Sequence, residues 1–133
     1  MKKWSALAWL AVVFVACGGQ ALAAVTEGTW GGQHLVLELE SSGATLQFDC
    51  AHGSFDGALT LDAKGHFERT GVFVRQHGGP VRKDEVEDAR PARFTGSVDG
   101  DTMKITVTLV DGSLPAQEYT LKLGSPGRIF RCY

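Results

Sequence analysis

No apolar run in this sequence is long enough to span a membrane as a helix. The most apolar stretch, residues 4–16, has roughly 13 residues, against the ~20 that a spanning helix needs. It follows the positive Met1-Lys2-Lys3 and precedes the small residues Ala21-Leu22-Ala23, which is the order of a bacterial secretion signal. We therefore expect residues 1–23 to be a signal peptide and residues 24–133 to form one exported domain.

A second processing site is present inside the same segment. Phe14-Val15-Ala16-Cys17 resembles a lipobox, in which Cys17 would become a lipidated N-terminus. We expect a periplasmic or secreted protein, with an outer-membrane lipoprotein as the alternative. Contact with a membrane is expected only in that lipidated form.

Cysteine is scarce, and the Cys-x-x-Cys spacing of many redox and zinc sites is absent. Of the three cysteines, Cys17 falls in the signal, so Cys50 and Cys132 remain for the exported domain. The oxidising compartments to which proteins are exported favour disulfides. Pairing these two residues closes a loop of roughly 80 residues, worth on the order of 4 kcal/mol in the chain-entropy model. We expect one structural disulfide, Cys50–Cys132.

The exported domain also lacks an excess of positive charge. Without Lys2 and Lys3, 11 Lys and Arg residues face 15 Asp and Glu residues, a formal charge of −4. There is no basic stripe with interleaved aromatic residues, so we expect no nucleic-acid partner.

Helical periodicity is missing, and period-2 alternation dominates. Leu35, Leu37 and Leu39 alternate with other residues, as do Met103, Ile105, Val107 and Leu109. We expect eight strands, over 34–40, 44–50, 53–61, 66–75, 93–99, 102–110, 117–123 and 128–133. A small antiparallel up-and-down β-barrel would leave no exposed sheet edge, so it is the expected all-β fold, with a two-sheet β-sandwich as the alternative.

The connections between these strands sort onto two ends of such a barrel. Tight glycine-bearing turns at 41–43, 62–65, 99–101 and 124–127 share one end. The connections at 51–53, 76–91 and 111–116 share the other end with the entry of the first strand. The long connection 76–91 is expected to be a loop, in which a short helical turn over 84–89 is one alternative. The alternation places Cys50 and Cys132 at this second end, beside Trp30.

Gly28-Thr29-Trp30, just before the first expected strand, resembles the G-x-W entry of the calycin group of lipocalins and avidin-like proteins. The resemblance implies that Trp30 packs over the barrel floor against an arginine near the last strand, for which Arg128 and Arg131 are available. Trp30 is the one tryptophan of the exported domain, so a biotin site is not expected. The large inward residues favour a filled barrel over a deep calyx, since eight strands are just wide enough for side chains to fill.

The sequence contains no convincing catalytic or metal-binding pattern. His34, His52 and His77 are expected at the looser end, with Asp49 or Asp84 nearby, but their spacing matches no zinc motif. Ser54 lies two residues from His52 without a third catalytic group. We therefore expect no cofactor, no metal site and no catalytic residue.

The resulting expectation is an exported, non-catalytic binding protein of the bacterial envelope that acts through the loop-bearing barrel end. Its ligand would be a small molecule or a protein. The candidate binding residues are Trp30, His34, His52, His77 and Arg131. Three alternatives stay open: a small-molecule carrier with an internal calyx, a periplasmic inhibitor of a lysozyme or protease, and a metal-binding protein or enzyme.

Overall fold

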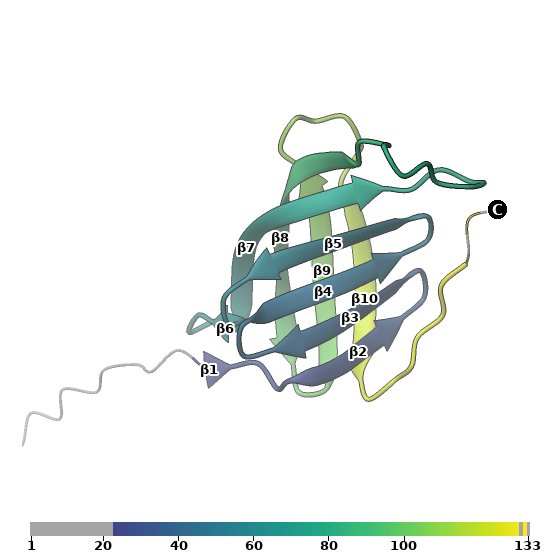
Figure 1. Ribbon diagram of the computed structural model, residues 1–133. Coiled ribbons are helices and arrows are strands. Elements are labelled where there is room, and N and C mark those ends of the chain that lie inside the picture. Colours follow the sequence, from purple (N-terminus) through teal and green to yellow (C-terminus); the bar gives the residue numbers. More distant parts are fainter. Residues whose placement is uncertain (1–22, 131, 133) are drawn as a thin grey trace, which may run out of the picture.

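The computed structural model describes residues 23–130 and 132, in which eight antiparallel strands close into a barrel (Figure 1). The barrel order is β10-β2-β3-β4-β5-β7-β8-β9. The strands are β2 Gly28–Gly32, β3 Leu35–Glu40, β4 Gly43–Phe48, β5 Ala51–Asp56, β7 His66–Arg75, β8 Asp88–Asp99, β9 Thr102–Leu109 and β10 Gln117–Leu123. The short strands β1 Ala23–Ala24 and β6 Thr60–Leu61 form a separate two-stranded sheet. The expected all-β barrel is confirmed, and its closure excludes the β-sandwich.

Apolar side chains from all eight barrel strands fill the interior as one hydrophobic cluster. Leu35, Leu37 and Leu39 of β3 are at most 3% exposed, as their alternation predicted. Trp30, Phe94 and Met103 are also fully buried, and no polar or charged residue in the described ranges is buried. No helix within those ranges has the length and apolar character of a membrane span.

The strand expected over 53–61 is wrong in its bounds, because β5 covers Ala51–Asp56 and Thr60–Leu61 belongs to the separate sheet. The first and last strands of the barrel also differ from the expectation. Gly28–Gly32 forms β2, whereas the expected strand over 128–133 is wrong, because Ile129 and Phe130 lie in no strand. From this segment, Arg128 contributes only an isolated parallel bridge to Gln33. The strand count is therefore right, but the eighth strand is supplied from the N-terminal side.

This exchange places Trp30 at a different end from the disulfide. The Cys50–Cys132 bridge is present, with Cα atoms 5.0 Å apart. It lies at the end that carries connections 33–34, 49–50, 76–87 and 110–116, which we call the disulfide end. β2 enters from the opposite end, where the Trp30 indole N–H donates to the Thr26 carbonyl at 3.0 Å. The expected position of the disulfide beside Trp30 is therefore wrong, although its position beside the long loop is confirmed.

The long loop is shorter than expected, covering 76–87, because β8 begins at Asp88 and includes Pro91. Pro91 is tolerated because its carbonyl accepts from the Val110 N–H, which places its nitrogen on the β9 side of β8, where the β8–β9 ladder begins only at Ala92. Its missing N–H therefore removes no ladder hydrogen bond. The alternative of a helical turn over 84–89 is also wrong, since the loop contains turns but no helix.

Candidate functional site at the disulfide end

The C-terminal residues form an irregular segment that ties two turns of the disulfide end together. We call residues 124–130 and 132 the C-terminal strap; Figure 1 shows it passing outside β2. The Arg128 N–H donates to the Gly32 carbonyl at 2.9 Å, and the His34 N–H donates to the Arg128 carbonyl at 2.7 Å. Further along, the Phe130 N–H donates to the Asp49 carboxylate at 2.6 Å, and Cys132 closes the disulfide. The strap thus joins the β2–β3 turn to the β4–β5 turn.

Both joined turns hold a residue in a backbone conformation that favours glycine. Within the described ranges, His34 (φ 70°) and Cys50 (φ 56°) are the two non-glycine residues with positive φ. His34 is held there by a hydrogen bond between its Nδ1 and the Asp49 carboxylate, and its ring centroid lies 5.4 Å from that of Phe130. Such conformations persist where the surroundings over-determine them, and they cluster at functional sites. The strap supplies those surroundings at both turns.

A groove of about 540 Å³ lies between the strap, the β4–β5 turn and loop 76–87. The described residues include six large hydrophobic side chains that are exposed, and four of them line this groove: Val81, Val86, Ile129 and Phe130. Val81 is 74% exposed and Val86 is 91% exposed. An exposed apolar cluster rimmed by polar groups marks an interaction site more often than scattered exposed residues do.

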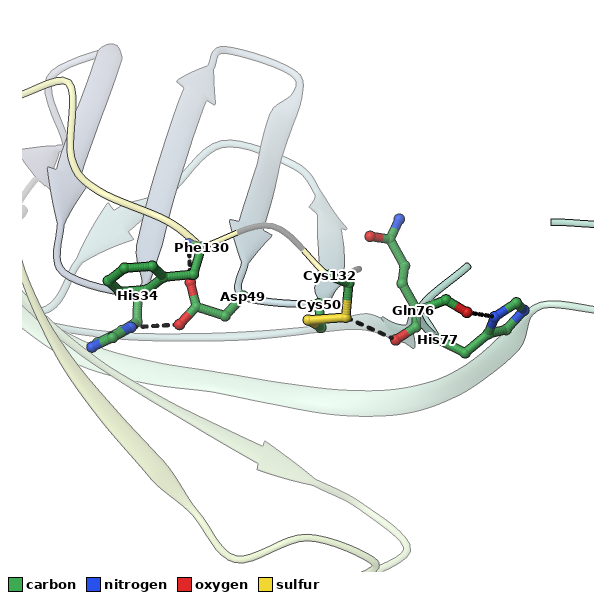
Figure 2. Close-up of a disulfide and its surroundings, with 8 residues drawn as sticks. His34, Asp49, Cys50, Gln76, His77, Phe130 and Cys132 are labelled. Carbon is green, nitrogen blue, oxygen red and sulfur yellow. Dashed lines mark hydrogen bonds and ion pairs between the residues drawn. A yellow bond between two sulfur atoms is a disulfide. The ribbon is translucent and has the colours of Figure 1, made fainter. Parts of the chain in front are cut away.

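Two histidines with different hydrogen-bond partners lie in the polar part of the groove. His52 Nδ1 is 3.0 Å from Gln76 Nε2, and the Gln76 carbonyl lies 3.8 Å from the Cys132 Sγ. His77 directs Nδ1 to the Gly78 carbonyl at 2.8 Å and Nε2 to the Glu85 carboxylate. Figure 2 shows the disulfide between the His34–Asp49 pair and His77. His34 and His77 therefore lie on opposite sides of the disulfide.

Both ring nitrogens of His77 face acceptors, so the doubly protonated ring is favoured. The Gly78 carbonyl and then the Glu85 carboxylate raise the pKa of His77 above its ordinary value of 6.5. The protonated ring joins Gly78 and Glu85 of the same loop. This local stabilisation is present below the ordinary pKa and is lost as the pH rises through the raised pKa.

Replacing Glu85 by Gln is expected to lower the pKa of His77 toward its ordinary value, because the negative acceptor at Nε2 is removed. A histidine titration by NMR measures this change directly. His66, which lies at the other barrel end in β7, is the internal control, and its NMR signals are expected to be the same in the variant and the unaltered protein. An unaltered His77 titration in the variant would show that the His77–Glu85 contact is absent in solution.

A second recess, of about 520 Å³, lies on the other side of the β4–β5 turn, between Asp49 and the first half of β10. The pairing of β10 with β2 is limited to Leu121–Leu123, so residues 117–120 pair with β9 alone. Tyr119 projects here, and its ring lies 5.5 Å from that of Phe48. Burial, followed by the Asp49 charge, raises the pKa of Tyr119 above its ordinary value. Asp49 thus lines this recess and Cys50 lines the groove, on either side of the β4–β5 turn.

The structure gathers three of the five candidate binding residues at this end. His34, His52 and His77 lie there as expected, whereas Trp30 is buried in the barrel and Arg131 lies outside the described residues. The three histidines have separate partners, and no group of three potential metal ligands occurs among the described side chains. Of the two arginines expected to be available to Trp30, Arg131 lies outside the described residues, and Arg128 instead contacts Phe130, whose ring centroid lies 5.9 Å from the Arg128 guanidinium carbon.

The apolar residues of the groove were missed by the sequence reasoning. Val81 and Val86 stand alone in a polar, charge-rich loop, and that isolation is the signal that could have identified them. Ile129 and Phe130 were instead assigned to a strand that the structure lacks.

The fold and this site define a small disulfide-tied β-barrel with an apolar groove at one end. Comparison with known proteins found no family model, no curated protein and no solved structure that matches this chain. Its function must therefore be inferred from the groove itself.

Proposed function

We propose that this protein is an exported, non-catalytic binding protein that holds the apolar part of its ligand in the groove beside the disulfide. The observation that carries the proposal is that four of the six exposed large hydrophobic residues in the described part of the chain line this groove. An exposed apolar surface costs solubility, and covering it with a ligand removes that cost. The packed barrel interior favours this site over an internal calyx.

The proposed compartment is the periplasm or the exterior of a bacterial cell. The order of charges, apolar residues and small residues at the N-terminus supports export, as does a disulfide between the two remaining cysteines. Cleavage after Ala23 would leave Ala24, one of the two residues of β1, at the start of the exported chain. The mass of the purified exported protein distinguishes this product from one lipidated at Cys17.

Groove binding can be tested with N-phenyl-1-naphthylamine, an apolar dye that fluoresces when it leaves water. We expect the exported protein to bind it, and replacement of both Val81 and Val86 by Ser to weaken binding about tenfold, ~1.4 kcal/mol. The reason is that the dye can then cover less apolar surface, at about 25 cal/mol per Å². A fluorescence titration gives both dissociation constants.

The matched control is Val72→Ser, because Val72 is exposed on β7 but does not line the groove. It is expected to bind the dye as the unaltered protein does. Absence of dye binding, or equal affinities for all three proteins, would show that the groove is not the apolar binding site.

A further inference from the structure

We infer that the natural occupant of this groove is a positively charged, amphipathic segment of a partner protein, an inference that rests on the proposed function. To bind such a segment, the groove must offer an apolar surface, an excess of negative charge and a shape that suits an extended chain. The apolar surface is the exposed cluster of Val81, Val86, Ile129 and Phe130. The other two features come from the charges around the recesses and from the free side of β10.

Negative charge dominates the walls of the two adjoining recesses. Five carboxylate side chains line them, against a single guanidinium, that of Arg75. The carboxylates belong to Asp49, Glu85, Glu87, Asp88 and Glu118. Without the histidines, this set of described residues has a net charge of −4, and the protonated His77 described above reduces it to −3.

Part of this negative charge has no partner among the residues that the structure describes. Asp49 pairs with His34, Glu85 with His77, and Asp88 with Arg90. Glu87 and Glu118 form no ion pair with any described residue. A ligand that covers these two carboxylates without supplying a cation would pay for their desolvation, whereas a lysine or arginine offsets it. The charge therefore selects a basic ligand.

The shape favours a peptide over a small amine. The two recesses lie on either side of the Asp49–Cys50 turn. A ligand that reaches both Glu87 in the groove and Glu118 in the second recess must therefore pass across that turn. Beyond it, residues 117–120 of β10 have no strand partner on the β2 side. An extended chain can hydrogen-bond to such a strand, with its apolar side chains in the neighbouring groove. A segment that alternates apolar and basic residues satisfies all three features.

The test uses the exported protein with its disulfide intact and three fluorescent peptides of identical apolar sequence. Their polar positions carry Lys, Gln or Glu. By fluorescence anisotropy at low salt, we expect the Lys peptide to bind at least about tenfold more tightly than the Gln peptide, and the Glu peptide to bind weakest. Raising the ionic strength from about 0.05 M to about 0.5 M is expected to reduce the advantage of the Lys peptide, because screening shortens the range of the charges.

The double variant Glu87→Lys/Glu118→Lys is expected to lose that advantage. Glu40→Lys is the matched control, because Glu40 is an exposed carboxylate at the opposite barrel end, and it is expected to keep most of the advantage. Thermal melts of both variants establish that they fold. Equal binding of the three peptides, or equal losses in the two variants, would overturn the inference.

The dye separates this inference from the proposed function. Dye bound in the groove without preferential binding of the Lys peptide would overturn the basic partner and leave the groove as a binding site. Failure of both dye and peptides to bind would overturn both proposals. Tight binding of the Lys peptide that competes with the dye supports both.

Discussion

Replacing Cys50 and Cys132 together by Ser is expected to lower the free energy of unfolding by about 4.5 kcal/mol. The two residues are 82 positions apart, and closing a loop of this length removes that much chain entropy from the unfolded state. Domains of this size are stabilised by about 5–15 kcal/mol in total, so the loss is a large share. Urea unfolding of the oxidised protein and the double variant gives the difference, and reduction of the unaltered protein by dithiothreitol is expected to produce a similar loss.

The same change is expected to weaken dye binding in the groove. Ile129, Phe130 and Cys132 line it, and without the disulfide the last anchor of the C-terminal strap is lost. The contacts of Arg128 and Phe130 remain, so the strap should loosen at its end first. A difference in unfolding free energy below about 1 kcal/mol would contradict the entropic account. Unchanged dye affinity would show that the strap is not a required wall of the groove.

The barrel could be predicted from the sequence because the apolar residues at alternate positions of its strands are the residues that the core buries. Each leucine of 35–39 and each apolar residue of 103–109 faces the core, and the pattern has no competing explanation. The turn at 62–65 was predicted for a similarly local reason. The Asp62 carboxylate accepts from the Lys64 and His66 N–H groups, which also lowers the pKa of Asp62.

The two ends of the chain could not be predicted because their structure depends on contacts between distant residues. Gly28–Gly32 contains three glycines, which disfavour strands, yet it forms β2. A Cβ at Gly32 would lie 2.2 Å from the Thr120 carbonyl oxygen, so glycine is needed for the approach of β10. Residues 128–130 alternate like a strand but follow the turns outside the barrel. Neither the pairing of Gly28–Gly32 nor the course of residues 128–130 can be predicted before it is known which segments they contact.

The candidate site was half predictable for the same reason. The alternation of strand directions was sufficient to place His34, His52 and His77 at one end with the long loop. It could not show that Asp49 would hold both His34 and Phe130, because Asp49 and Phe130 are 81 positions apart. Residues 128–133 were predicted to form the eighth strand that Gly28–Gly32 forms instead. This single error was enough to make the predicted position of Trp30, beside the disulfide, wrong.

Gly31 provides the sharpest test of how the C-terminal strap is held. Gly31 occupies a position of β2 that faces the outside of the barrel. It is nevertheless buried, because the strap covers it. A Cβ there would lie 2.2 Å from the Ser125 carbonyl oxygen and 2.4 Å from the Gly127 nitrogen, both of which are backbone atoms of the strap. Backbone cannot rotate aside as a flexible side chain can. The strap must therefore move away if Gly31 becomes alanine.

Gly31→Ala is expected to cost about 3 kcal/mol, at the upper end of the usual range for overpacking. Gly100→Ala is the control, because a Cβ there meets nothing within 4 Å and only its positive φ of 60° is strained, at about 1 kcal/mol. Hydrogen exchange locates the damage. The Arg128 and His34 amides, which bond across the strap, should lose protection, whereas the Val98 amide, bonded to the Gly65 carbonyl at the opposite end, should keep it. Uniform loss at all three amides would mean that the barrel itself, rather than the strap, depends on Gly31.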